Sequence, residues 1–354
     1  MVNMELQSRL APLVKLDRRN IPLGTKEIRA FLCVKNENLR LPYLLEYHRQ
    51  LGIGRFLIID NGSTDGTLEY LLGQQDCHVF SSKGNFFAHN TDPPIWTNAL
   101  LNVFGDGHWC LTLDGDEMFV FPHCENVSIQ SLCEYLDYTG ANAVEALVID
   151  MYGKAAIRNS HYERGDSFLD QHRFFDPEFG FCSANERSYP PIVMFSRFRE
   201  RAFWKGRHAQ QRPPCITQIP LVKWRKGMAY LVCIHTIEHA KLSELRTGIL
   251  HFKFLPGFLQ SIVTSLKENA DVAEKGLQER KNYIETLEKD PGLSLYHSGS
   301  VEYRNSKQLV ELGWLKTSRD YESFLTRAEN QSRSSCRSQP LPPPSIDYKR
   351  SAPS

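Results

Sequence analysis

The chain has 354 residues, with 42 Lys and Arg against 41 Asp and Glu, and carries a formal charge of +1. This balance excludes a protein that binds nucleic acid mainly through charge, because such binding needs a surplus of Lys and Arg on one face. No apolar run reaches the roughly 18 residues of a membrane-spanning helix, and the first 20 residues lack the apolar core of a signal peptide. We therefore expect a cytoplasmic protein with no transmembrane segment.

The segment 27–150 alternates apolar β-rich runs with helical patterns, which predicts βαβ units and a mostly parallel sheet. Periodicity is lost over 152–215, where aromatic residues, Pro, Arg and His dominate, as is typical of a binding surface. Strand patterns return over 220–254, and polar helical stretches follow over 256–289 and 306–316. The expected strands in the first segment are 28–34, 55–60, 77–80, 109–114 and 142–150, with helices over 39–52, 65–74, 95–104 and 128–140.

These patterns predict an α/β fold with a central sheet flanked by helices and a C-terminal helical extension. The tail holds seven Ser and five Pro among 27 residues, so we expect it to be disordered. The expected organisation is an N-terminal extension (1–26), a main domain (27–255) with a first half (27–150) and a second half (151–255), a C-terminal helical region (256–327) and the tail (328–354).

Acidic motifs follow three of the predicted strands. They are KNE (Lys35, Asn36, Glu37), DNGSTDGT (60–67) and DGDE (114–117). Because the carboxyl ends of parallel strands meet at one edge, where open α/β sheets bind ligands, we expect the motifs to share one crevice. Carboxylate oxygens at such a place favour a hard cation, Mg²⁺ or Mn²⁺, over zinc.

In this order, and with Tyr47 and His48 in the first helix, the motifs resemble the family-2-like glycosyltransferases of the GT-A fold. The resemblance covers residues 27–120 well and the rest loosely. It implies a GT-A-like (Rossmann-like) sheet in the main domain, with a nucleotide and metal half (27–150) and an acceptor-side half (151–255). It also implies an inverting, metal-dependent transfer of a sugar from a nucleoside-diphosphate sugar, foremost a UDP-sugar, to a glycan or glycolipid hydroxyl. Mn²⁺ or Mg²⁺ is the implied cofactor, and polysaccharide assembly with peripheral membrane association is the implied setting.

The same resemblance assigns roles to individual acids. Asp116 becomes the metal ligand and Asp114 a ribose or metal contact. Asp60 becomes a base or ribose contact, beside Asn61, where the family more often has a second Asp. The other residues expected at the nucleotide are Asn36, Glu37, Asp65, Asn98 and Lys253. For the first two motifs, the alternative is a turn that caps a helix; for Trp96, next to the nucleotide candidate Asn98, it is core packing.

A third metal ligand in GT-A enzymes commonly comes from a downstream His, and His251 and His235 both lie in strand-like segments. His251 and Lys253 are two residues apart, so a strand would place a ligand and a cation on one face; the alternative is a His packed in the core. An inverting transfer also needs a carboxylate that takes a proton from the acceptor. Asp150 is the first candidate because it ends a strand; the others are Asp176, Glu178 and Glu186.

Other classes remain to be weighed. A catalytically degenerate nucleotide-sugar or glycan-binding protein of the same fold is the alternative that nothing in the sequence excludes. Phosphatases with an aspartyl nucleophile need a small hydroxyl or β-branched residue where this chain has Met118. Sugar nucleotidyltransferases need a Gly-rich first loop, in place of which the chain has KNENLR (35–40).

Overall fold

The fold is described from a computed structural model of the chain, over residues 13–22, 24, 26–82, 92–183, 192–204, 213–268 and 274–337. The chain divides into two compact units, Met1–Thr317 and Ser318–Ser354. The predicted boundary at residue 255 therefore does not separate two compact units, because the helices that follow it belong to the first.

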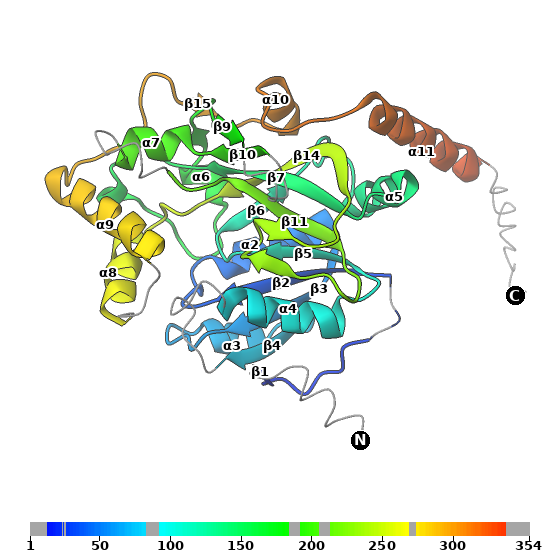
Figure 1. Cartoon of the computed structure of the whole chain (residues 1–354), viewed down its shortest axis with the longest axis horizontal. Helices are drawn as coiled ribbons and strands as arrows, with labels where there is room; N and C mark the ends of the chain where they lie inside the picture. The colour runs from blue at the N-terminus through cyan, green and yellow to red at the C-terminus, as the bar shows by residue number, and fades with distance from the viewer. Residues whose placement is uncertain are drawn as a thin grey trace, which may run out of the picture. The chain divides into compact units, whose positions relative to one another are not determined.

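A mixed sheet forms the centre of the first unit (Figure 1). Its nine described strands lie in the order β1-β4-β3-β2-β5-β11-β7-β14-β6. The neighbours β4, β3, β2 and β5 are parallel, β11 is antiparallel between β5 and β7, and β14 is parallel to β7. Six of these nine strands thus run the same way, and the prediction of an α/β fold with a mostly parallel sheet is confirmed. The strands are β1 (Leu13–Lys15), β2 (Ile28–Val34), β3 (Ile53–Asp60), β4 (Cys77–Ser82), β5 (Trp109–Leu113), β6 (Glu117–Val120), β7 (Ala143–Asp150), β11 (Thr217–Lys223) and β14 (Leu242–His251).

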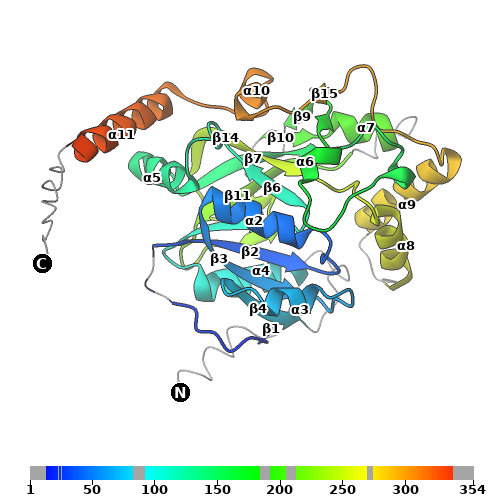
Figure 2. The same ribbon diagram turned by 180° about the vertical axis from the view of Figure 1, so that it is seen from behind.

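Helices cover both faces of the sheet, with α4 in front in Figure 1 and α2 in front in Figure 2. Local sequence sets their ends: α2 has Pro in its first turn and stops at Gly52, whose φ of 112° is accessible to glycine at low cost. The Ser128 side chain accepts a hydrogen bond from the Ser131 amide at the start of α5. These helices are α2 (Leu41–Leu51), α3 (Thr67–Leu72), α4 (Asp92–Phe104) and α5 (Ile129–Thr139).

The sheet curls back on itself at the DGDE motif. β5 ends at Leu113 and β6 begins at Glu117, yet β11, β7 and β14 lie between these strands in the sheet order. A link of three residues reaches at most about 14 Å from strand end to strand start. The curl therefore brings β6 back over the edge at which β5 ends, and α2 contacts both β3 and β6.

Tyr47 and His48 of α2 bind the outer edge of β6, the last strand of the described sheet. The Tyr47 hydroxyl donates to the Phe119 carbonyl at 2.8 Å, and the Phe119 amide donates to His48 Nε2 at 3.3 Å. Backbone groups at a sheet edge need such partners when they are buried. These two residues, which contribute to the family resemblance, have a structural role here.

Acid is expected to destabilise the fold through His48. Burial lowers the pKa of this imidazole to about 4, so it is neutral in the folded protein near neutral pH. Between its ordinary pKa and about pH 4 the unfolded chain binds more protons than the folded chain, and stability falls as the pH falls. From about pH 7 to pH 5 this group alone accounts for a loss of about 2 kcal/mol in the free energy of unfolding. Urea unfolding at pH 7 and at pH 5 measures this loss of stability. If His48→Gln lost as much stability between the two pH values as the wild-type chain does, His48 would not be its source.

The region 152–215 is folded around short elements rather than unpatterned. Its described parts contain η1 (Ile157–Asn159), α6 (Phe168–Gln171), β8 (Phe174–Phe175), β9 (Gly180–Ser183), β10 (Ile192–Phe195) and α7 (Arg197–Phe203). The apolar run 229–237 is a hairpin of β12 (Tyr230–Val232) and β13 (Thr236–Ile237), not the single strand expected. Cys233 turns the chain there with a φ of 44°.

The C-terminal part of the first unit packs on the region 152–215 through aromatic residues. It contains α8 (Phe258–Glu268), α9 (Glu274–Lys289), β15 (Val301–Glu302) and α10 (Ser306–Glu311). Tyr283 of α9 packs against Phe203 of α7, with ring centroids 4.7 Å apart, and against Phe258 of α8 at 5.3 Å. Burial of such rings is a large source of stability, so α7, α8 and α9 are fixed to one another.

The second unit is α11 (Arg319–Arg337). This helix runs past residue 328 as far as Arg337, because all five Pro of the tail lie beyond residue 339 and leave this stretch free to be helical. The expected disorder of the tail stays a prediction. Residues 338–354 lie outside the described part. No helix in the described ranges combines the length and the apolar character that crossing a bilayer requires.

Candidate functional site

The carboxyl ends of the parallel strands border a cleft of about 580 Å³. Asp150 and His251 end the neighbouring strands β7 and β14, where they are register partners, and His251 is also opposite Glu117. The curl of the sheet adds the 114–117 turn to the same edge. The described residues that line the cleft include Cys33, Lys35, Asn36, Glu37, Arg40, Asp114, Gly115, Asp116, His251, Lys253, Phe258, Gln260, Ser261, Ile262, Glu279, Arg280 and Tyr283.

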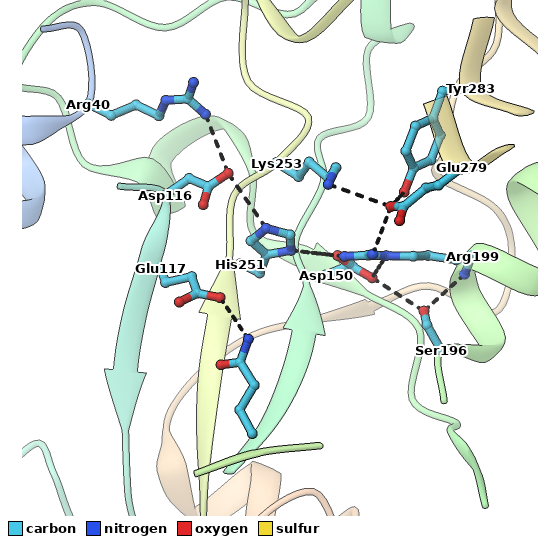
Figure 3. Close-up of polar contacts among 11 residues, drawn as sticks. Arg40, Asp116, Glu117, Asp150, Ser196, Arg199, His251, Lys253, Glu279 and Tyr283 are labelled. Carbon is cyan, nitrogen blue, oxygen red and sulfur yellow. Dashed lines mark hydrogen bonds and ion pairs between the residues drawn. The ribbon is translucent and has the colours of Figure 1, made fainter. Parts of the chain in front are cut away.

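Asp116 and His251 face each other across this edge (Figure 3). Asp116 Oδ2 lies 3.5 Å from His251 Nε2 and 3.5 Å from Arg40 Nη1. Burial opposes charge on the imidazole, but the carboxylates of Asp116 and Asp150 outweigh it and raise the pKa of His251 to about 9. A carboxylate oxygen of Asp116 and a ring nitrogen of His251, which are 135 residues apart in sequence, therefore meet at the wall of the cleft.

Behind His251 lies a buried ion pair. His251 Nδ1 donates to Asp150 Oδ1 at 2.8 Å, and the Arg199 guanidinium binds both Asp150 oxygens, at 2.7 and 2.8 Å. The Asp150 side chain is only 1% exposed. Burial works against its charge, yet Arg199 and His251 hold the pKa of Asp150 well below its usual range. The carboxylate thus fixes the ring of His251 and is closed to the cleft.

The turn of the DGDE motif is held from below by Glu117. Its carboxyl accepts from the Asp114 amide at 2.9 Å and from Gln218 Nε2 at 3.2 Å. Burial, with Asp114 nearby, raises the pKa of Glu117 to about 8. Burial and Asp116 also raise the pKa of Asp114, to about 6. Glu117 therefore orients the turn, while Asp114 lines the cleft.

Gly115 permits a close approach between two motifs. A Cβ atom there would lie 2.8 Å from Glu37 Cγ. Glu37 in turn binds Arg40 Nε at 2.6 Å, although burial raises the pKa of its carboxyl to about 7. The first and third motifs are thus in direct contact, as their shared sheet edge predicted.

The first and second motifs bind each other through hydrogen bonds. Asn36 has a φ of 58°. Its side-chain Oδ1 accepts from the Thr64 backbone amide at 2.8 Å, and its backbone amide donates to Ser63 Oγ. Asp65 accepts from the Asn38 amide and the Thr67 hydroxyl. These contacts match the alternative reading of a capped turn. Asn36 also lines the cleft, whereas Asp65 does not.

Three other residues predicted at the nucleotide do not line the cleft either. Asp60 is 3% exposed and accepts from the Ser63 amide, and Asn61 donates to Ser82 Oγ at 2.8 Å. Asn98 uses both ends of its amide on the Tyr230 backbone, at 2.8 and 2.9 Å. Their predicted contacts with a nucleotide stay predictions.

The two downstream histidines differ in position. His251 is at the cleft, while His235 Nδ1 contacts the Thr217 carbonyl at 2.6 Å outside the cleft lining. The expectation that His251 and Lys253 share one strand face is wrong in detail, because β14 ends at His251. Both side chains nevertheless line the cleft.

Asp176 and Glu178, the other base candidates among the described residues, do not line the cleft. Asp176 is 8% exposed and bound by Tyr152 and Arg201, Glu178 is exposed, and Glu186 lies outside the described residues. Trp96 is buried in the core, as its alternative reading expects. Arg199, Glu279 and Tyr283 were not predicted from the sequence as site residues. Only the helical pattern of RFRERAF (197–203) indicated that Arg199 faces inward.

Comparisons with known proteins give weak likenesses. No protein-family model matches the chain, and no curated protein matches it. A crystal structure of HddC from Yersinia pseudotuberculosis is similar at 12% identity, over 39% of this chain and 70% of that chain, with a TM-score of 0.24. The UTP-bound UGPase from Acinetobacter baumannii is similar at 7% identity, over 73% and 82%, with a TM-score of 0.27. Likenesses at this level carry no argument about what this chain does.

Proposed function

We propose that this chain is a metal-dependent glycosyltransferase that moves a sugar from a nucleoside-diphosphate sugar to an acceptor hydroxyl. The observation that carries the proposal is the pair of Asp116 and His251, 3.5 Å apart at the cleft wall beyond the carboxyl ends of the strands. Open α/β sheets bind their ligands at this edge.

The donor set fits Mn²⁺ or Mg²⁺ held together with phosphate oxygens. In the described ranges no three His, Cys, Asp or Glu side chains form a complete metal site. Such a cation at a nucleotide commonly takes one or two carboxylates and fills its other positions with substrate phosphates and water. Asp116 and His251 would hold it, with the imidazole giving up its Nε2 proton on binding, and Asp114 lines the cleft beside them. A histidine ligand fixed through its other nitrogen by a carboxylate, as His251 is by Asp150, is a common support for a metal.

The remaining cleft residues suit a diphosphate. The cation, when bound, supplies positive charge against the charge that the leaving nucleoside diphosphate gains. Lys253 and Arg40 line the same cleft and add side-chain charge for phosphate oxygens. Because Asp150 is closed off by Arg199, we assign it to positioning His251 rather than to taking a proton from the acceptor.

Calorimetric titration tests the proposal directly. UDP-glucose, UDP-galactose, UDP-N-acetylglucosamine and GDP-mannose are titrated into the protein with Mn²⁺ and again with EDTA. We expect at least one of them to bind with Mn²⁺ and to lose about tenfold or more in affinity with EDTA, as one metal-phosphate contact requires. Absence of nucleotide binding with Mn²⁺ would refute the proposal.

A second measurement separates transfer from binding alone. Release of the nucleoside diphosphate from the bound donor, followed over hours with candidate glycan acceptors, is expected of a transferase. Metal-dependent binding with no release under any acceptor would instead favour a nucleotide-sugar-binding protein of the same fold.

A further inference from the structure

The wall of the cleft opposite the DGDE turn comes from α8 and α9, where the sequence analysis expected no site residue. Gln260 and Ser261 of α8 and Glu279 and Tyr283 of α9 line it. Figure 3 shows Glu279 and Tyr283 entering from one side, with Lys253 and Arg199 between them and His251. A chain of contacts through Asp150 and Arg199 thus connects this wall to the metal side of the cleft.

Glu279 is held through one of its two carboxylate oxygens. Oε1 accepts from the Tyr283 hydroxyl at 2.6 Å and from Arg199 Nη1 at 3.3 Å, and lies 3.7 Å from Lys253 Nζ. All three of these contacts are made by Oε1, and no described residue has a hydrogen bond to Oε2. The side chain is 24% exposed and lines the cleft. The carboxylate is therefore fixed in orientation and keeps an acceptor for a ligand.

The charge at Glu279 restricts what that ligand is. Burial opposes its charge, but Lys253 and Arg199 prevail and lower the pKa of the carboxyl. An ionised carboxylate only accepts hydrogen bonds, so it repels phosphate oxygens and binds hydroxyl groups. Phe258 and Ile262 line the same part of the cleft with apolar surface. A polar acceptor beside apolar side chains matches a sugar ring, which has hydroxyls on its rim and C–H groups on its faces.

We propose that Glu279 binds the hydroxyl groups of the sugar in the nucleoside-diphosphate sugar and so determines which sugar is taken. This inference rests on the proposed function. The diphosphate lies by Asp116, His251 and Lys253, and the sugar extends toward α9. Because Arg199 binds both Asp150 and Glu279, the distance between the two ends of the donor site is fixed by the protein.

The experiment compares UDP with UDP-hexoses by calorimetry in Mn²⁺, for the wild-type chain and for Glu279→Gln. Wild type is expected to bind one UDP-hexose more tightly than UDP. Glu279→Gln is expected to lose about tenfold or more of that preference, the effect of one hydrogen bond to a charged group, and its affinity for UDP alone is expected to change by less than its affinity for the UDP-hexose. Glu288→Gln, the same change at an exposed position of α9, serves as the matched control and is expected to behave as wild type.

Deoxy sugars make the test independent of how well the variant folds. Each monodeoxy form of the preferred UDP-hexose is titrated into the wild-type protein, and one of them is expected to lose about tenfold in affinity. In Glu279→Gln the difference in affinity between that deoxy form and its parent is expected to shrink, because the negative charge is gone and the NH2 group that replaces one carboxylate oxygen cannot accept from the hydroxyl.

The outcomes are distinguishable. Absence of any nucleotide binding by wild type refutes the proposed function, and this inference with it. Wild-type binding of UDP and UDP-hexoses with equal affinity leaves the proposed function standing and overturns the role of Glu279. An equal loss for UDP and UDP-hexose in Glu279→Gln also overturns it, because that pattern belongs to a residue that only supports the fold.

Discussion

Asp116→Asn is expected to weaken Mn²⁺-dependent binding of UDP by more than about 100-fold. Changes at residues that only support a metal ligand typically cost up to about 100-fold in metal affinity, and a ligand itself is expected to cost more. The substitution keeps the shape of the side chain and removes the charge that faces His251 Nε2 at 3.5 Å. Calorimetry of UDP with Mn²⁺ measures the nucleotide affinity, and electron paramagnetic resonance measures the free Mn²⁺.

Asp137→Asn is the matched control for this change. Asp137 lies on α5, 42% exposed, and pairs with Lys223 far from the cleft lining. Its variant is expected to bind UDP and Mn²⁺ as wild type does. If Asp116→Asn bound them equally well, Asp116 would not be a metal ligand.

Arg199→Met is expected to lower the free energy of unfolding by about 3–5 kcal/mol, the cost of leaving one partner of a buried ion pair uncompensated. Arg199 and Asp150 have side chains only 7% and 1% exposed, and Met leaves the carboxylate with His251 and Ser196 alone. Urea unfolding of the full chain measures the loss. Where the variant remains folded, Mn²⁺ affinity is expected to fall about 10–100-fold, because the His251 ring loses its fixed support.

Arg197→Met, on the same helix, is the control. The Arg197 side chain is 51% exposed and pairs with Glu200 one turn away, so its loss is expected to change stability by no more than about 0.5 kcal/mol. The double variant Asp150→Asn/Arg199→Met is expected to cost less than the sum of the two single changes, since it removes both charges. Equal stability of the Arg199 and Arg197 variants would contradict the importance of the buried pair.

The sheet and its acidic edge were predictable because the information is local. The runs 28–34 and 55–60 are apolar apart from Arg29, Arg55 and Asp60, as strands buried on both faces are. Glu37 and the 114–117 turn meet because the parallel strands that precede them share an edge. Gly52 ends a helix through its backbone freedom, and Ser128 begins one through the acceptor oxygen of its side chain. The β5–β6 curl was not predictable, since nothing near DGDE indicates that β6 pairs with a strand more than 120 residues later.

The functional contacts are less local, which explains what was missed. Arg199 and Glu279 lie in segments whose composition is typical of solvated surface, and their burial depends on partners 49 and 80 residues apart in sequence. Asn98 shows the converse: its position suited a nucleotide contact, but its amide binds a backbone 132 residues away. Pairings of this length come from the tertiary fold, so no local pattern identifies the partner of each residue.

The hydrogen bonds of Arg199 bear on attempts to redesign the proposed sugar site. Exchanging α8 and α9 for helices of another sequence would remove Glu279 from Arg199 Nη1 and disturb the guanidinium that holds Asp150. A graft therefore has to carry α7 with it, or supply a carboxylate at the position of Glu279. If the proposed site is correct, a redesign confined to the α8–α9 wall is otherwise expected to alter metal affinity as well as sugar specificity.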